Sequence, residues 1–221
     1  MLIQIKFICI TILLLFCAFL SHAQHPQSVK KKEALPDMLF THRLQRAIHL
    51  DAAENKNLSH LYYDRDSNVS IITLLLDALM SNNIRAYYQM KDTAAFLSRE
   101  QAMQILTETK TITGKDFTPS VINTLILFED WYLDKNTRKA KHELMLAAPA
   151  IQYDEPKKKQ QILFYIRPSD FAKICESYYI KVADKNDTEL AVTLNEYFTE
   201  RYFISDIQRE EIIQIEYEYT H

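Results

Sequence analysis

Glycine is nearly absent from this chain: Gly114 is the only glycine among 221 residues. Loops that cradle phosphate groups need backbone positions with positive φ, a conformation that glycine adopts at the least cost. The composition therefore argues against a phosphate-binding loop. The sequence also lacks the patterns HExxH, G-x-S-x-G and paired Cys-x-x-Cys, which excludes the common zinc-protease, serine-hydrolase and structural-zinc motifs.

Cysteine is scarce, and two of the three cysteines lie in the only long hydrophobic run, residues 7–20. Lys6 precedes this run, and a small-x-small cleavage site ends at Ala23, as in secretory signal peptides. We predict a signal peptide over residues 1–23, with cleavage between Ala23 and Gln24. An uncleaved anchor is the alternative, but the run of fourteen residues falls short of the ~20 that span a bilayer.

The cysteine positions exclude an intramolecular disulfide once the signal peptide is removed. Cys9 and Cys17 leave with it, and Cys175 remains alone. Lipidation at Cys17 is disfavoured because the bulky Phe16 precedes it. Cys175 lies at helical spacing from apolar residues, so we predict a packed, unreactive core thiol.

Basic residues are not in excess in the mature chain. It carries 25 Lys and Arg, all but Lys6, against 29 Asp and Glu, which gives a net charge of −4. Nucleic-acid binding needs a positive field, so this balance argues against it. A mature chain of 198 residues can bury roughly 70% of its unfolded surface in one core. We predict one domain over residues 40–221, preceded by a polar flexible leader over residues 24–39.

Capping signals and apolar periodicity predict several helices. Residues 69–80 are apolar on nearly every face, which is typical of a helix in the interior or covered by a partner chain. Its candidate N-caps are Asp66, Ser67 and Asn68. A second helix begins at Ser98, where Gln101 completes a capping box, and runs to about residue 109. Two more are predicted to begin at Pro168 and at the capping pair Asn186 and Glu189.

Short apolar runs between polar loops predict an antiparallel β-meander that packs one face on the helices, an α+β fold. The predicted strands cover residues 84–88, 121–133, 143–153 and 161–167. The last is apolar on both faces, which favours a central position. Residues 44–63 show only a short strand or helix near residues 47–50. Residues 213–219 alternate strictly, so they complete the domain's own sheet, which we favour, or add to a neighbour's sheet edge.

The longest predicted hairpin holds the main candidates for chemistry or contact. Glu129 and Asp130 precede Trp131, the only tryptophan, and Asp134 follows. In a strand, Asp130 and Asp134 point to one face, and Glu129 and Trp131 point to the other. Catalytic carboxylates need an environment that separates their pKa values, which the pattern does not supply. We therefore favour ion pairs with the loop at residues 135–141 or with a neighbouring subunit, and a core position for Trp131 over an interface contact.

The segment EDWYLDK (129–135), followed by LMLAAPA (144–150), resembles the central signature of the GldN/PorN family. Further blocks resemble the family domain in the same order, at residues 44–63, 70–88, 162–174 and 194–207. Members of this family are periplasmic ring components of the type IX protein secretion and gliding machinery. Three departures indicate a divergent or accessory member: the short chain, Leu133 in place of an aromatic residue, and Ala147 with Ala148 in place of a glycine.

The resemblance implies an exported, non-enzymatic assembly protein that needs no cofactor. It would form a ring with a GldK/PorK-like outer-membrane lipoprotein and contact GldL/GldM-like inner-membrane motor proteins. Its location would be the periplasm, at the outer membrane through that partner. The family-motif residues are then the candidate interface: Glu129, Asp130, Trp131, Tyr132, Asp134, Lys135 and Pro149.

Two other functions stay open at this point. A periplasmic ligand-binding or folding-assistance module could share the domain, and it would need an apolar pocket with a few inward polar groups. A hydrolase is the third hypothesis, and it would centre on Glu129 and Asp130.

Overall fold

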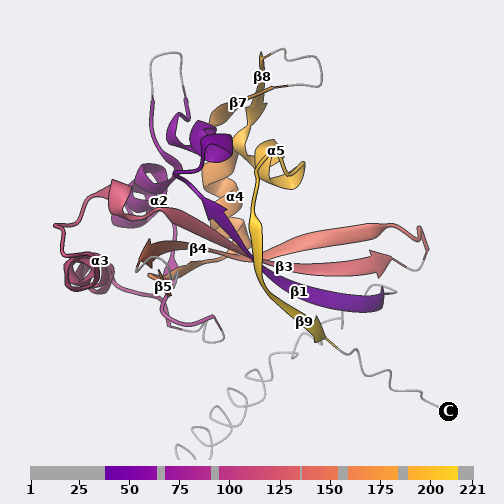
Figure 1. The fold of residues 1–221 in the computed structure, drawn as a ribbon, viewed down its shortest axis with the longest axis horizontal. Helices are drawn as coiled ribbons and strands as arrows, with labels where there is room; N and C mark the ends of the chain where they lie inside the picture. The colour runs from indigo at the N-terminus through magenta and orange to yellow at the C-terminus, as the bar shows by residue number, and fades with distance from the viewer. Residues whose placement is uncertain are drawn as a thin grey trace, which may run out of the picture. The chain divides into compact units, whose positions relative to one another are not determined.

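The computed structural model describes residues 38–63, 68–90, 95–134, 136–153, 159–183 and 189–213. Its centre is an antiparallel sheet with the strand order β2-β6-β4-β3-β1-β9, and β5 also pairs with β4 (Figure 1). The strands are β1 (Met38–His49), β2 (Ala86–Tyr87), β3 (Thr124–Asp134), β4 (Ala140–Tyr153), β5 (Lys159–Ile162), β6 (Tyr165–Ile166) and β9 (Asp206–Ile213). A separate hairpin consists of β7 (Tyr179–Ala183) and β8 (Glu189–Thr193).

Helices cover one face of the main sheet. They are α2 (Ile71–Met80), α3 (Arg99–Thr113), α4 (Pro168–Glu176) and α5 (Leu194–Thr199), with the 3-10 helices η1 (Ala53–Ser59) and η2 (Pro119–Val121). Figure 1 shows α2, α4 and α5 on the same side of the sheet. Ile48, Leu125 and Leu127 of the sheet belong to the same core cluster as the buried residues of these helices. The predicted α+β class, antiparallel strands packed against several helices, is confirmed.

Helix α2 is buried on nearly every face, as its apolar sequence predicts. Its N-cap is Ser70 and not one of the three predicted residues, because the Ser70 hydroxyl accepts a hydrogen bond from the Thr73 amide at 3.0 Å. The helix ends at Met80, and Asn82, two residues further on, adopts a left-handed conformation with φ of 56°. The amide of Asn83 then donates to the Ala78 carbonyl at 2.9 Å and closes the last turn.

The only glycine of the chain ends a helix. The capping box of α3 is present as predicted: the Ser98 hydroxyl accepts from the Gln101 amide, and the Gln101 side chain accepts from the Ser98 amide. The helix continues to Thr113, four residues beyond the expected end. Gly114 follows with φ of 69°, and its missing Cβ makes this left-handed position inexpensive. The single glycine therefore occupies the C-cap of α3, where the backbone needs positive φ.

The predicted hairpin is formed by β3 and β4, whose register runs from Thr124 opposite Ala150 to Leu133 opposite Ala140. Alternate residues of β3 face opposite sides of the sheet, so Leu125 and Leu127 join the helix-side core. Ile126 and Phe128 join a second buried cluster with Ala47, Leu146, Ala148 and Ala150. The centre of the hairpin is therefore buried on both faces.

Two predicted elements are wrong in their boundaries. The strand predicted over residues 161–167 is split into β5 and β6, which pair with different parts of β4. Pro149 lies between these parts, where its missing N–H costs no ladder bond, and its carbonyl accepts from the Leu163 amide at 3.0 Å. The helix predicted from residues 186–189 begins later, after strand β8. Its capping box is formed by Thr193 and Glu196, while Asn186 lies outside the described residues.

The segment with the weakest sequence pattern forms one of the longest strands. β1 begins at Met38, two residues before the expected start of the domain, and lies between β3 and β9. Its partner β9 pairs antiparallel with it from Asp206 to Ile213. This pairing lies within the chain, but of the alternating residues 213–219 only Ile213 is described. The signal peptide and the leader up to residue 37 also lie outside the described residues.

Candidate functional site

Part of the sheet projects beyond the helices. Figure 1 shows the turn end of β3 and β4, together with the adjoining end of β1, extending past the helical layer. The burial of β3 changes at the same place, since it is buried from Thr124 to Glu129 and half-buried from Asp130 to Asp134. We call this region the sheet arm, made of residues 38–43, 129–134, 140–144 and 210–213. Five of the family-motif residues lie on it, Pro149 lies in the buried sheet, and Lys135 is outside the described residues.

A buried carboxylate lies at the base of the sheet arm. The side chain of Glu129 is only 3% exposed, and its two oxygens accept three hydrogen bonds. Arg46 of β1 donates from Nε at 2.9 Å, Arg201 donates from Nη1 at 2.6 Å, and Trp131 donates from its indole nitrogen at 2.9 Å. Charge-assisted bonds of this kind are stronger than neutral ones. The two guanidinium groups supply the compensation that a buried carboxylate needs.

Arg201 reaches Glu129 through an unusual backbone conformation. It follows α5 with φ of 60°, a left-handed position that is costly for any residue with a Cβ. The Tyr202 amide donates to the Tyr197 carbonyl at 3.0 Å and ends the helix there. The ion pair between Arg201 and Glu129 helps to offset this backbone strain, because the pair forms only when Arg201 adopts the left-handed conformation.

Trp131 is neither a core residue nor a freely exposed one. It is half-buried, which contradicts the favoured prediction of a core position. Its ring stacks on His142 of β4, with centroids 4.9 Å apart and an angle of 21° between the rings. The guanidinium carbons of Arg46 and Arg201 lie 5.5 Å and 5.1 Å from the indole centroid, within cation–π range. Trp131 therefore packs its ring against the groups that neutralise Glu129.

The acidic residues on the other face and at the tip also form ion pairs. Asp130 accepts two parallel bonds from Arg43, each of 2.7 Å, and this hydrogen bonding raises the pKa of Arg43. Asp134 pairs with Lys141 at 2.5 Å and also accepts from the amides of Asn136 and Thr137. The pKa of Asp134 is lowered to about 2, mainly by the Lys141 hydrogen bond.

The ion pairs predicted for this segment exist, but mostly with other partners. Only Asp134 pairs with the predicted loop of residues 135–141, through Lys141, which the structure places at the start of β4. Glu129 and Asp130 pair with arginines from outside the hairpin. Tyr132 is half-buried between Thr41 and Lys141 in the strand register. Because Glu129 and Asp130 point to opposite faces and are each held by arginine, they do not form a facing catalytic pair. This geometry opposes the hydrolase hypothesis.

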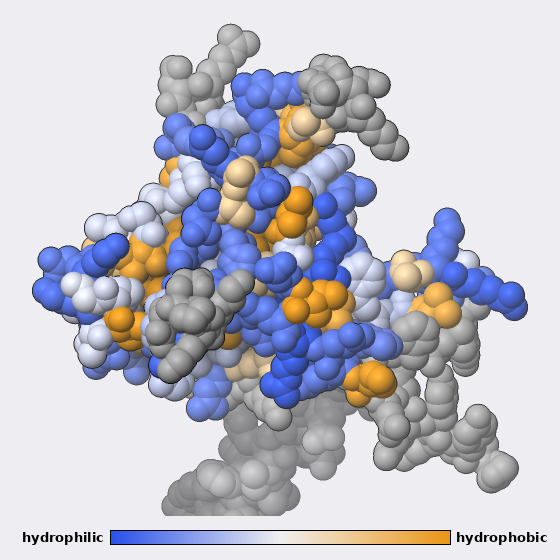
Figure 2. All heavy atoms as spheres, viewed as in Figure 1, coloured by the Kyte–Doolittle hydropathy of each residue, from blue (hydrophilic) through white to orange (hydrophobic). Residues whose placement is uncertain are grey.

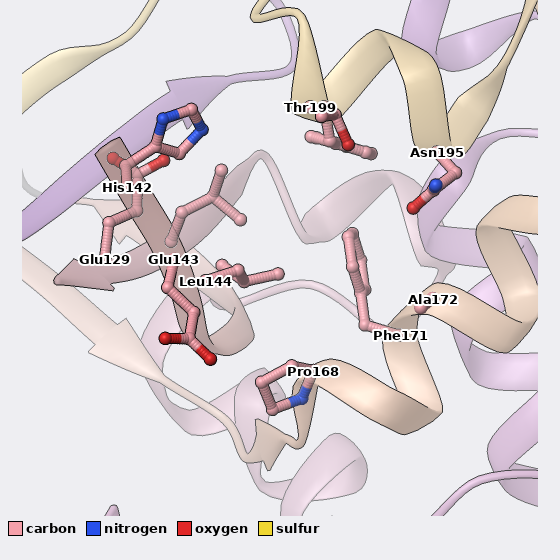
Figure 3. Close-up of a pocket in the computed structure, with 11 residues that line it drawn as sticks. Glu129, His142, Glu143, Leu144, Pro168, Phe171, Ala172, Asn195 and Thr199 are labelled. Atoms are coloured by element: carbon pink, nitrogen blue, oxygen red, sulfur yellow. The ribbon is translucent and has the colours of Figure 1, made fainter. Parts of the chain in front are cut away.

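A cavity adjoins Glu129 on the helix side of the sheet. Its volume is about 330 Å³, and Leu127, Leu144, Phe171 and Phe198 form its apolar walls. Figure 3 shows Glu129, His142 and Glu143 on one side of the space, facing Asn195 and Thr199 of α5 on the other. No local sequence pattern indicates this cavity, because its lining comes from β3, β4, α4 and α5.

Histidine and cysteine residues take structural positions. His42 lies 2.6 Å from Glu210, and His49 lies 3.2 Å from Asp206, so both histidines link β1 to β9. No group of three metal-ligating side chains occurs among the residues that the structure describes. Cys175 is buried in α4 as predicted, and burial raises the pKa of its thiol well above the usual range.

Comparison with known proteins identifies the family. The family model described as "Gliding motility associated protein GldN" matches residues 34–217, a range that includes all the described residues and the sheet arm with them. The chain belongs to the GldN family. Membership associates it with gliding motility, and GldN is not a known enzyme family. Among curated proteins, none matches the chain. Within its described part, no helix is both long and apolar enough to cross a membrane.

Removing the Glu129 carboxylate tests whether it holds the base of the sheet arm. We expect Glu129→Ala to lower the free energy of unfolding by about 3 kcal/mol, because two arginines lose their common partner in a largely buried place. Urea denaturation monitored by tryptophan fluorescence measures the change. Asp116→Ala is the matched control, since its ion pair with Lys110 is exposed and should contribute little. Equal stability of the two variants would show that the Glu129 network is not a major support.

His142 should make stability depend on pH. Its pKa is lowered mainly by burial. Among the nearby charges, Glu129 and Glu200 oppose this shift, and Arg201 and Arg46 add to it. The unfolded chain therefore takes up the proton first, and stability is lost as the pH falls below the ordinary value of about 6.5.

We expect His142→Phe, which keeps a ring against Trp131, to reduce the fall in melting temperature between about pH 7.5 and about pH 5.5. Thermal unfolding of both proteins across this range measures the difference. The same fall in both would mean that another group is responsible.

Proposed function

We propose that this GldN-family chain is a non-enzymatic periplasmic component of the type IX secretion and gliding machinery. It assembles into a ring with a GldK/PorK-like outer-membrane lipoprotein and contacts GldL/GldM-like motor proteins of the inner membrane. Family membership supports the link to gliding motility. The N-terminal segment up to Ala23, which has the pattern of a signal peptide, supports export to the periplasm.

The observation that carries the proposal is how the family-motif residues are used. Glu129 and Asp130 are engaged by arginines, and Asp134 closes the turn of the hairpin. A catalytic site leaves reactive groups accessible to a substrate, whereas these carboxylates are tied to their own protein. They stiffen a part of the sheet that projects past the helices, and a stiff projecting element suits a subunit that is held by neighbours.

Ring assembly sets a geometric requirement that the chain can meet. A ring forms when two different surfaces of each subunit make the same head-to-tail contact until the circle closes. The sheet arm supplies one surface, with half-buried aromatic residues such as Trp131 and Tyr132 that suit a contact. The mechanism is then mechanical: the subunit transmits or resists force and turns over no substrate.

Co-purification from native envelopes tests the assembly role. We expect the tagged full-length chain to be recovered with an outer-membrane lipoprotein, and Trp131→Ala to weaken this recovery. Because Trp131 is half-buried, its loss should cost less than the ~3–5 kcal/mol typical of a fully buried tryptophan.

Leu190→Ala is the control, since Leu190 is 48% exposed and lies on the separate β7–β8 hairpin. A chain recovered only as a soluble monomer would contradict the proposal. Recovery that is unchanged in Trp131→Ala would remove the indole from the contact.

The cavity next to Glu129 supports a second candidate function, a ligand-binding or folding-assistance module. Its size and its apolar walls with a few polar groups fit the general character of small-ligand sites. Thermal shift with a panel of metabolites and peptides separates the two functions, because a scaffold should show no shift. A shift that disappears in Phe171→Ala would favour the binding module.

A further inference from the structure

Strand β9 forms an open edge of the main sheet. It pairs with β1 on one side, and among the described residues no strand pairs with its other side. Every side chain from Asp206 to Ile212 is exposed. Ile207 and Ile212 are 54% and 71% exposed. None of these side chains is buried in the folded chain.

An ordered edge strand without buried side chains has little hydrophobic burial to offset its loss of conformational entropy. Ordering each residue costs roughly 1–2 kcal/mol of backbone entropy, which burial of side chains normally offsets. A free edge also presents a row of backbone N–H and C=O groups that can pair with another strand. Eight residues at about 3.3 Å each give an edge of roughly 26 Å. This length is sufficient for a specific added strand.

The register assigns different chemistry to the two faces of β9. Ile207 lies opposite Arg46, and Ile212 lies opposite His42, so both isoleucines are on the helix side of the sheet, the side of Trp131. Arg209 and Glu211 lie on the other side and form an ion pair along the strand. Figure 2 shows separate hydrophobic groups among hydrophilic ones in the region where Figure 1 draws β9. Glu210 lies opposite Leu44 on the helix side, between the two isoleucines. The helix-side face of the edge is therefore apolar and acidic, and the other face carries the Arg209–Glu211 ion pair.

We propose that β9 accepts an added β-strand from a protein partner, and that this strand carries apolar and basic residues. Apolar residues would lie opposite Ile207 and Ile212, and Lys or Arg would lie opposite Glu210 and Glu211. The inference deepens the proposed assembly role and rests on it, since it names the surface and the chemistry of one contact.

The charges on β9 favour a different protein over a second copy. The strand carries three acidic residues and one basic residue over Asp206–Ile213. If two copies of β9 paired antiparallel about a two-fold axis, the helix-side face of one strand would continue into the helix-side face of the other. Residues of the same face would then lie directly opposite each other. In the register centred on residue 210, Glu210 faces itself, while Arg209 faces Glu211 on both sides. Three acidic residues against one basic residue still leave a net charge of −2 on each strand, so two copies would bring two negative edges together. A basic strand would instead neutralise the edge.

Two synthetic peptides of eight residues test the proposal on the full mature chain. One has two central lysines flanked by valines, and the other has glutamates in place of the lysines. We expect the lysine peptide to bind about tenfold more tightly and to slow amide hydrogen exchange in β9. Equal binding of the two peptides, or unchanged exchange in β9, would overturn the proposal.

Matched variants locate the binding edge. Ile207→Lys with Ile212→Lys should abolish peptide binding, whereas Leu190→Lys changes an exposed residue on the other hairpin and should leave it intact. All these side chains are exposed, so the melting temperatures should stay close to that of the parent chain. Peptide binding that survives the double substitution would place the site elsewhere.

The result separates this inference from the proposed function. Loss of envelope co-purification in the parent chain would defeat the assembly role itself. Normal co-purification of the β9 double variant would defeat only the strand-addition site. Concentration-dependent dimers of the purified chain that disappear in the double variant would show that a second copy occupies the edge, and would also overturn the proposal.

Discussion

The carboxylate of Glu129 joins three distant parts of the chain. It is buried on β3, accepts from Arg46 on β1, and accepts from Arg201 at the end of α5. A buried carboxylate is tolerated only where its charge is compensated and its oxygens are hydrogen-bonded. The strand order, the end of α5 and the position of Trp131 therefore depend on one another. Loss of this carboxylate would remove the contacts with Arg46, Arg201 and Trp131 together.

This arrangement explains how a small domain can present a stiff projecting sheet. Beyond the helical layer, Glu129 is the only buried side chain among those that the structure describes in the arm. Ion pairs and stacked rings hold the arm: Asp130 with Arg43, Asp134 with Lys141, and Trp131 with His142. Networks of linked charges contribute more than isolated surface pairs do. Carboxylates such as Glu129 and Asp130 would suggest catalysis if they lined a cleft, but here they stabilise the sheet arm through ion pairs.

Sequence patterns located the local elements well because short-range physics forms them. The capping box at Ser98, the apolar helix α2 and the hairpin of β3 and β4 each follow from neighbouring residues. Strand β1 was predicted only as a short strand or helix near residues 47–50, because it carries charged residues on both faces. Arg43 and Arg46 are accommodated only through their ion pairs with carboxylates on β3. The cavity was missed for the same reason, since four separate elements supply its walls.

The sequence by itself determined the α+β class, the hairpin, the capping box at Ser98 and the family, because these depend on periodicity, turn chemistry and the order of motifs. Only the tertiary structure decided which groups meet. Glu129 is 83 residues from Arg46 and 72 residues from Arg201, and no local pattern encodes a pairing over such distances. It arises when strand order and a left-handed turn bring the charges together, since a buried carboxylate must find its counter-ions wherever the fold places them.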